Sequence, residues 1–250
     1  MIELRNVHKA FGSREILRGL SLEVPEGQNT VIIGYSGTGK SVTLKCIIGL
    51  LQPDAGEVEV DGAIVGAMEP DELVALRGKI GYVFQSAALF DSMTVNENIA
   101  LGLRRRAIAE GELRDRIEES LAVVALGDAG EKYPSELSGG MRKRVGVARA
   151  IALKPKYILY DEPTTGLDPV TSAVMDELMV RTRDLGVTGV IVTHDMRSAF
   201  TAGDRVAMLY EGQIRQVGPA AELRETDDPV VRQFIEGRPD ATLSLRRAER

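Results

Sequence analysis

The chain has 250 residues, 44% of them hydrophobic and 27% charged, which is enough apolar material for one large domain or two small ones. Its net charge of −6 argues against a general nucleic-acid binder, because such proteins are usually basic, and its single cysteine excludes a disulfide framework or zinc knuckle. No apolar run reaches the roughly 18 residues that span a bilayer, and the stretch "MIELRNVHKAF" alternates like a strand and lacks the apolar region typical of a signal peptide. We therefore expect a soluble, cytoplasmic chain that could still dock on a membrane protein.

Short strands are predicted in the N-terminal part at "IELRNV", "LSLEV", "NTVII" and "EVEV", separated by Gly and Pro. His8 continues the first of these strands and is interpreted as structural. A buried helix is predicted from Lys40 through "KSVTLKCIIGLL", which is apolar on nearly all sides and places Cys46 in the core. The next strand, "KIGYVFQ", is predicted to end at Gln85.

A helical segment is predicted from about residue 86 to about residue 145, because hydrophobic residues recur there at helical spacing between charged ones. Strand patterns then return, with helical patterns between them, at 157–160, 189–193 and 205–210. Strands that alternate with helices predict a parallel α/β sheet. The helical segment lies inside this pattern and is therefore predicted to be an inserted subdomain.

Residues 34–41, "GYSGTGKS", match the G-x-x-x-x-G-K-[ST] pattern between a predicted strand and a predicted helix, which is the context of a phosphate-binding loop. The glycines let the backbone wrap around an anion, since side chains there would clash. Lys40 can supply a positive charge to the β- and γ-phosphates, and the Ser41 hydroxyl can ligate Mg²⁺. The motif predicts nucleotide binding.

Polar residues also follow other strands of the predicted sheet. "YILYDEP" ends in Asp161, which can hold Mg²⁺ through water, and Glu162, which can deprotonate an attacking water. His194 and Gln85 likewise stand at strand ends, so all four are expected at the carboxyl edge of the sheet beside the P-loop. We interpret His194 as a γ-phosphate contact and Gln85 as a metal or water contact. Taken alone, the two acids could form a solvated turn and His194 could be structural.

Six motifs in this order resemble the ATPase subunit of an ABC transporter. "GYSGTGKS" is similar to the Walker A loop, Gln85 to the Q-loop and "LSGGM" to the signature, while "YILYDEP" is similar to the Walker B strand, "TTGLDP" to the D-loop and His194 to the switch histidine. The resemblance implies an α/β fold of the P-loop NTPase class. It comprises a RecA-like core, an antiparallel N-terminal β-subdomain and the inserted α-helical subdomain.

The resemblance also implies domain limits. One ABC ATPase domain would cover residues 1–236, with the RecA-like core and β-subdomain at about 1–85 and 146–236 and the helical subdomain at about 86–145. A tail at 237–250 would be disordered or contact a partner.

Site residues are implied in the same way, with ATP and Mg²⁺ as cofactors. The implied catalytic residues are Glu162 as the base, His194, Gln85 and Lys40. The implied ATP-binding residues are Phe11, Gly34, Ser36, Gly37, Thr38, Gly39, Lys40, Ser41, Val42, Ser138, Gly139, Gly140 and Asp168. Phe11 would stack on adenine, where the family more often has Tyr. The implied Mg²⁺ ligands are Ser41, Gln85 and Asp161.

Partners are implied because two subunits of this family face each other head to tail. The signature turn of one chain, Ser138 to Gly140, would cap the γ-phosphate in the P-loop of the other. This chain has one Walker A loop and one signature, so the resemblance implies a homodimer. It would bind transmembrane permease subunits at the cytoplasmic face of the inner membrane, and no nucleic acid.

Several segments are most similar to the ATPases of Mla-type phospholipid transporters, which work with MCE-domain lipid-binding proteins. They are "SGTGKSV", "LFDSMTVNENIALGL", "MRKRVGVARAIALKP" and "DPVVRQFIEG". Met141 stands where the usual signature has Gln, and Tyr160 where an aliphatic residue is common. The alternative is the ATPase of an importer for a small polar solute such as an amino acid. A soluble ABC ATPase acting on nucleic acid or ribosomes is less favoured by the acidic charge.

Two surface features have alternative interpretations. Leu89 and Phe90 either belong to the core of the helical subdomain or, by the resemblance, line a groove for a helix of the permease. The three arginines at 104–106 are interpreted as a solvated face, with a headgroup or partner contact as the alternative.

Overall fold

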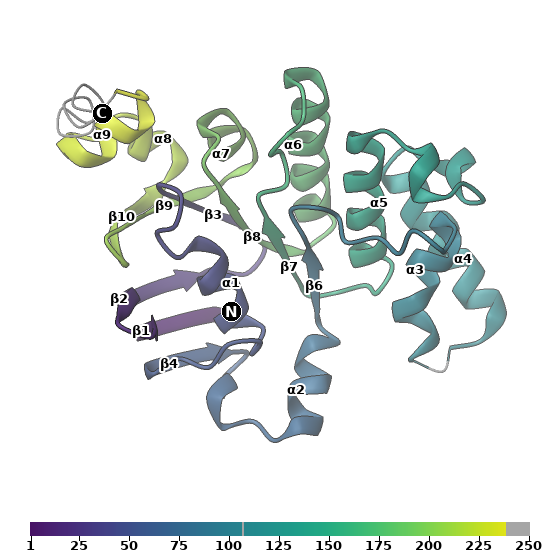
Figure 1. Cartoon of the computed structure of the whole chain (residues 1–250), viewed down its shortest axis with the longest axis horizontal. Helices are drawn as coiled ribbons and strands as arrows, with labels where there is room; N and C mark the ends of the chain where they lie inside the picture. Colours follow the sequence, from purple (N-terminus) through teal and green to yellow (C-terminus); the bar gives the residue numbers. More distant parts are fainter. Residues whose placement is uncertain (107, 239–250) are drawn as a thin grey trace.

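A six-stranded sheet in the order β10-β9-β3-β8-β7-β6 runs through the middle of the computed structural model, which describes residues 1–106 and 108–238 (Figure 1). Five of its strands are parallel: β3 (Asn29–Ile33), β6 (Ile80–Val83), β7 (Tyr157–Asp161), β8 (Thr188–Thr193) and β9 (Arg205–Tyr210). The edge strand β10 (Gln213–Pro219) pairs antiparallel with β9. The central strands β3, β7 and β8 are buried along their whole length, as expected for parallel strands covered on both faces.

Alternate residues of each strand point into two separate hydrophobic cores, one on each face of this sheet. Ile33 and Met208 contribute to the core that contains the helices α6 (Pro169–Asp184) and α7 (Met196–Ala202). Ile32 lies in the other core, with α1 (Lys40–Ile47) and the N-terminal sheet. The sheet is therefore covered on both faces, and only its strand ends can carry a site.

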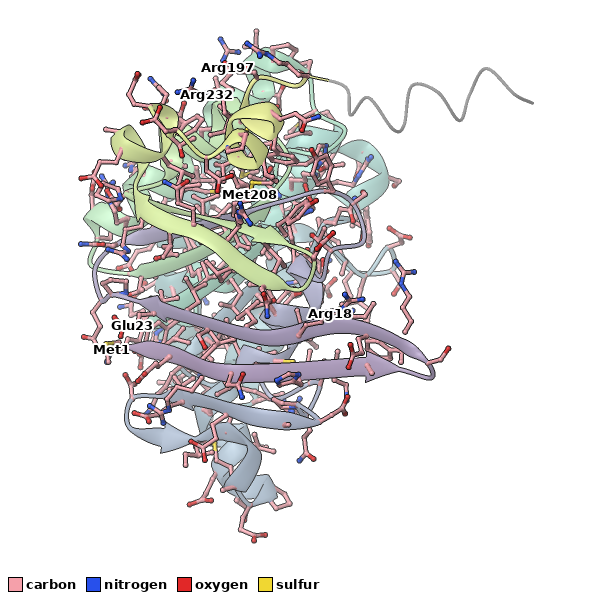
Figure 2. All side chains as sticks on the ribbon, turned by 90° about the vertical axis from the view of Figure 1, so that its left-hand side faces the viewer. Met1, Arg18, Glu23, Arg197, Met208 and Arg232 are labelled. Carbon is pink, nitrogen blue, oxygen red and sulfur yellow. The ribbon has the colours of Figure 1, made fainter. Side chains whose placement is uncertain are left out.

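The N-terminal sheet is antiparallel in the order β2-β1-β4-β5 and packs over α1. Its strands are β1 (Ile2–Phe11), β2 (Arg14–Val24), β4 (Ala55–Val60) and β5 (Ala63–Ile64), followed by η1 (Val65–Ala67) and α2 (Pro70–Arg77). Figure 2 places Arg18 of β2 beside β10, and its N–H donates to the Gly212 carbonyl at 2.9 Å. The two sheets are thus joined by main-chain hydrogen bonding.

Helix α1 confirms the predicted start at Lys40 and the burial of Cys46, whose thiol pKa is raised to about 11 by desolvation. The helix ends at Ile47, so the prediction that it continues through Leu51 is wrong. Gly49 ends it by adopting a φ of 66°, a left-handed conformation that glycine tolerates at helix ends.

The helical subdomain is inserted between β6 and β7, as predicted, and forms the teal part of the structure in Figure 1. It contains α3 (Val95–Arg104), α4 (Glu110–Val123), η2 (Gly127–Ala129), η3 (Pro134–Glu136) and α5 (Gly139–Ile151). Helix α5 crosses the position near 145 where the domain boundary was expected, and it packs against both the subdomain and β6. It is thus a physical link between the two parts.

The arginines at 104–106 are all exposed, and one of them also contacts the main chain. Arg106 donates from Nη1 to the Leu153 carbonyl at 2.7 Å and from Nη2 to the Gly78 carbonyl. All three arginines are exposed, as interpreted, and the guanidinium of Arg106 in addition bridges two loops.

The C-terminal part continues after β10 with α8 (Ala220–Arg224) and α9 (Pro229–Ile235). Of the predicted tail, Gly237 and Arg238 are described, and the rest lies outside the described residues. Within 1–106 and 108–238, no helix is both long and apolar enough to cross a bilayer.

Asp176 of α6 is a buried acid that we expect to destabilise the fold at neutral pH. It is 1% exposed, its Oδ1 has no hydrogen-bond partner, and burial raises its pKa from 3.8 to about 6. Below pH 4 the carboxyl is protonated in both folded and unfolded states, so the penalty is absent. It grows as the pH rises from 4 to 6, where only the unfolded state ionises freely, and is complete above pH 6.

Asp176→Asn is therefore expected to raise the free energy of unfolding by about 1–3 kcal/mol at pH 8. The gain should shrink steadily as the pH falls from 6 to 4. Urea denaturation at several pH values measures it, with the exposed Asp128→Asn as a matched control. A gain that is the same at pH 4 and pH 8 would contradict the assignment.

Candidate active site

The loop between β3 and α1 wraps tightly enough that glycine is needed at two of its positions. A Cβ on Gly39, which has a φ of 110°, would lie 2.7 Å from the Leu17 side chain, and one on Gly34 would lie 2.4 Å from the Leu209 carbonyl oxygen. Lys40 begins the helix and is 7% exposed. Its ammonium donates to the carbonyls of Gly34 at 2.8 Å and Tyr35 at 3.2 Å. The loop thus folds around the Lys40 ammonium.

Glu162 follows the last residue of β7 and its carboxylate faces the Lys40 ammonium, with Oε1 3.5 Å from Nζ. Its Oε2 lies 2.8 Å from Nδ1 of His194 and accepts from the Thr165 hydroxyl at 3.0 Å. The side chain of Glu162 is 12% exposed and that of His194 is 57% exposed. The structure therefore gathers a base candidate, a cation and a histidine from three separate strand–loop junctions.

Asp161 carries a charge that no basic side chain balances. The carboxylate is 9% exposed and accepts from the Ser41 hydroxyl at 2.7 Å and the Tyr82 hydroxyl at 2.9 Å. Among the described residues no Lys, Arg or His lies within 4.0 Å of it, and burial together with its charge raises the pKa of Tyr82. An unbalanced carboxylate beside a hydroxyl suits a hard, oxygen-liganded cation such as Mg²⁺.

Most of the residues expected to bind ATP come together in one cleft of about 510 Å³. It is lined by Phe11, Arg14, Ile16, Ser36, Gly37, Gly39, Lys40, Ser41, Val42, Gln85, Glu162, Thr165 and His194. Phe11 is half exposed, and the Lys9 ammonium lies over its ring, 5.8 Å from the ring centre. Thr38 lines a neighbouring cleft instead.

Three lining residues were not found from the sequence: Arg14, Ile16 and Thr165. Arg14 begins β2 directly after the two-residue turn that follows Phe11, and makes no ion pair within the described chain. A basic residue so close to Phe11 was the only available signal.

The signature residues and Asp168 do not line this cleft. Ser138 caps α5, its hydroxyl accepting the Met141 N–H at 3.2 Å, and Gly139 and Gly140 are the first residues of that helix. Asp168 caps α6 by accepting from Val170 N–H at 3.0 Å and Thr171 N–H at 3.1 Å, and bonds from Thr171 lower its pKa. These residues do not reach a ligand in the cleft of their own chain, so any ligand that they contact is held outside that cleft.

The two glycines of the signature turn, Gly139 and Gly140, differ in how tightly the chain packs around them. A Cβ on Gly140 would lie 2.3 Å from the Thr171 side chain, so packing of α5 on α6 requires this glycine. A Cβ on the exposed Gly139 would meet nothing closer than 3.9 Å. Packing within the chain therefore does not explain why residue 139 is glycine.

The sequence model of the ABC transporter family matches residues 17–165, more than half of the chain. The chain belongs to the ABC transporter family. It is the ATP-binding subunit, an ATPase that powers a transporter. The departures from the family pattern fit the fold: Met141 packs against the core, and the buried Tyr160 hydroxyl hydrogen-bonds to Thr182 at 2.8 Å.

Three curated relatives cover most of this chain. A probable ribonucleotide transport ATP-binding protein, mkl of Mycobacterium leprae, is 43% identical over 95% of this chain and 69% of its own length. The methionine import ATP-binding protein MetN of Symbiobacterium thermophilum is 43% identical over 89% and 69%. The intermembrane phospholipid transport system ATP-binding protein MlaF of Escherichia coli is 39% identical over 98% and 92%.

Solved structures of the ATP-binding cassette MJ0796 share the fold. One dimeric structure has a TM-score of 0.81 and 36% identity, covering 88% of this chain and 99% of its own. A dimeric post-hydrolysis state bound to ADP and Pi has a TM-score of 0.80 and 35% identity, with the same coverage. The predicted P-loop NTPase fold is confirmed.

Proposed function

We propose that this ATPase drives the movement of phospholipids between membranes. The observation that carries the proposal is the match to MlaF, which extends over nearly the full length of both chains, whereas mkl and MetN are matched over only about two thirds of theirs. A match that leaves little of either chain uncovered favours a subunit built like MlaF. The proposal includes an MCE-domain lipid-binding protein as a further partner.

In the proposed reaction, Glu162 is the base that accepts a proton from the water attacking the γ-phosphate. Its carboxylate is fixed by Thr165 and His194, so it is oriented before substrate arrives. Lys40 turns from the P-loop carbonyls and Glu162 toward the β- and γ-phosphates, which releases the base. Bound Mg²⁺, held by Ser41, Gln85 and, through water, Asp161, would neutralise phosphate charge.

The working unit in this proposal is a homodimer. Ser138, Gly139, Gly140 and Asp168 stand outside the chain's own cleft, yet the N–H groups at the start of α5 suit a phosphate. The dimeric MJ0796 structures, which share this fold, support the same assembly. Each ATP would then lie between the P-loop of one protomer and the signature turn of the other.

The permease is proposed to dock on the segment after Gln85, which makes this chain a peripheral subunit at the cytoplasmic face of the inner membrane. Phe90 is half exposed and its N–H donates to the buried Asn98 of α3 at 2.8 Å, while Leu89 packs partly on the core. Tyr133 is also exposed, next to Lys132, whose carbonyl accepts from Val95 at the start of α3. The two aromatic side chains thus flank one helix end, a surface suited to an incoming helix.

The alternative is an importer of a small polar solute, favoured by the 43% identity to a methionine import protein. To decide between them, the Glu162→Gln chain with ATP would be pulled from gently solubilised native membranes, with the same bait without ATP as control. Mass spectrometry should find a permease, an MCE-domain protein and phospholipid. A permease with a solute-binding protein would favour the alternative. Recovery with ribosomes or nucleic acid and no permease would contradict the transport proposal.

A further inference from the structure

We propose that Lys143 of α5 is a positioning residue for the catalytic base, because it fixes the main chain of the loop that carries Glu162. The inference deepens the proposed function and rests on Glu162 being the base. Lys143 lies in the basic stretch "MRKR" near the start of α5, where the sequence predicts no site residue beyond the signature turn.

Lys143 is a buried cation whose hydrogen-bond partners are all main-chain carbonyls of one loop. It is 8% exposed, and its ammonium donates to the carbonyls of Glu162 at 3.3 Å, Pro163 at 3.0 Å and Thr165 at 2.6 Å. No carboxylate of the described residues lies within 4.0 Å of it, and burial lowers its pKa. An ammonium has three N–H donors, so this loop satisfies them all. Such a buried charge is tolerable only while those three carbonyls stay in place.

The loop needs stabilising contacts from other elements, because Glu162 has a φ of 51°. A non-glycine residue in this left-handed region is sterically unfavourable and persists only where its surroundings over-determine it. The Glu162 N–H donates to the Val192 carbonyl at 3.0 Å, and the Glu162 carbonyl accepts from Lys143. The strained residue is therefore held on both sides, by β8 and by α5.

The same helix begins with the signature turn, since Gly139 lies one helical turn before Lys143 on the same face. A second basic residue of α5, Arg149, donates to the carbonyls of Ala87 and Ala88 at 2.8 and 2.7 Å, and both alanines have positive φ values. Helix α5 thus holds strained loop residues after Gln85 and at Glu162. A shift of α5 on contact of its first turn with the partner's ATP would therefore be transmitted through Lys143 to Glu162 of the same chain.

The test compares Lys143→Met with Arg144→Met, a matched control on the same helix. Arg144 also donates to main-chain carbonyls, those of Val124 at 2.9 Å and Ala125 at 3.3 Å, but remote from the cleft. Lys143→Met is expected to lower kcat for ATP hydrolysis at least about 10-fold with KM for ATP within about 2-fold of wild type, because a displaced base slows chemistry without affecting the P-loop. Arg144→Met should keep kcat within about 2-fold. Equal kcat values for the two variants would overturn the inference.

If Lys143→Met does not fold, Lys143→Gln replaces it, because its amide keeps two of the three donors. It should give a kcat between those of wild type and Glu162→Gln with unchanged KM; a wild-type kcat overturns the inference. Glu162→Gln in the same assay distinguishes a failure of the proposed base from a failure of the role of Lys143. Wild-type turnover by Glu162→Gln would overturn the base and, with it, the role of Lys143. Loss of turnover there, with normal kcat in Lys143→Met, would overturn the role of Lys143 alone.

A mixed dimer tests whether Lys143 acts on its own chain's base. With Gly139→Asp in one protomer to disable the partner's site, the surviving site uses the P-loop and Glu162 of that same protomer. Adding Lys143→Met to that protomer should lower the remaining turnover, and adding it to the other should not. The reverse pattern would overturn the inference.

Discussion

Glu162→Gln is expected to lower kcat for ATP hydrolysis by at least about 100-fold while ATP still binds, because a general base contributes on the order of 10² to 10⁴ in rate. The amide has the shape of the carboxylate but cannot accept the proton of the attacking water. In the structure the carboxylate also lies 3.5 Å from the Lys40 ammonium, so its removal frees Lys40 for phosphate. ATP should therefore accumulate uncleaved, and the protein should become dimeric with ATP. Phosphate release and light scattering with and without ATP measure both effects.

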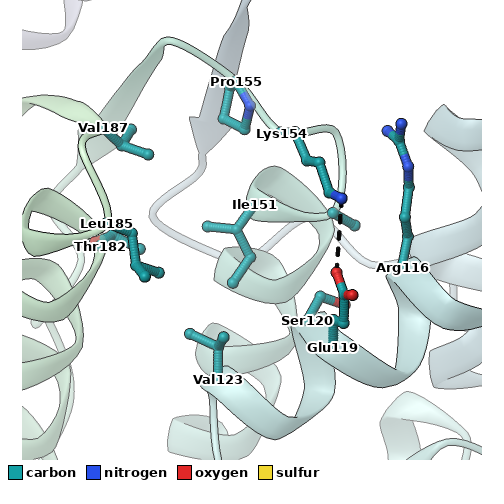
Figure 3. A pocket seen from close by; sticks show the side chains of 11 residues that line it. Arg116, Glu119, Ser120, Val123, Ile151, Lys154, Pro155, Thr182, Leu185 and Val187 are labelled. Carbon is teal, nitrogen blue, oxygen red and sulfur yellow. Dashed lines mark ion pairs between the residues drawn. The ribbon is translucent and has the colours of Figure 1, made fainter.

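The matched control is Glu119→Gln, which makes the same chemical change far from the cleft. Glu119 lies on α4, where it pairs with Lys154 at 3.8 Å on the rim of another pocket (Figure 3). Turnover and ATP-dependent dimerisation should both match wild type in that variant. Wild-type hydrolysis by Glu162→Gln itself would show that another group takes the proton.

The parts of the site that the sequence predicts are those fixed by local structure. The P-loop is a continuous strand–loop–helix unit, so its spacing alone positions Lys40 and Ser41. Asp161, Glu162 and His194 each stand at or just beyond the end of a buried strand, and parallel strands bring such ends to one edge. That is why the strand pattern alone predicts that these three residues lie beside the P-loop, although they are distant from it in the chain.

The parts that the sequence does not predict depend on tertiary contacts. Arg14 and Thr165 line the cleft only because of how β2 and the loop after β7 approach it. The carbonyl partners of Lys143 and Arg106 cannot be predicted from the sequence, since charge and helical spacing do not say whether a side chain will meet water or a carbonyl. In the structure both donate to main-chain carbonyls across the fold.

The contact between Lys40 and Glu162 indicates how substrate binding and catalysis are linked in the proposed reaction. Lys40 is shared between the P-loop carbonyls and Glu162, so the cation that is expected to bind phosphate also faces the proposed base. An anionic phosphate is the stronger partner for Lys40, since it brings more charge and more acceptor oxygens. Arrival of ATP would therefore leave Glu162 with His194 and Thr165 alone, oriented and free to accept a proton.

Gly139→Asp is expected to abolish turnover, by at least about 100-fold, while leaving the fold and the binding of ATP at the P-loop unchanged. The residue is exposed at the first turn of α5 and a Cβ there meets nothing closer than 3.9 Å, so the fold has room for the side chain. An acid at a helix N-terminus is also favourable for the helix itself. Any loss of activity must then arise between the two protomers, where the new carboxylate would repel the γ-phosphate of ATP held by the partner.

Gly139→Ala adds a methyl group without charge and should lose much less activity. Gly140 could not make the same point, because its Cβ would collide with Thr171 and the fold would change too. ATPase rate, nucleotide affinity and thermal unfolding of the three proteins decide the matter: full turnover by Gly139→Asp would mean that the signature turn does not act on the partner's ATP.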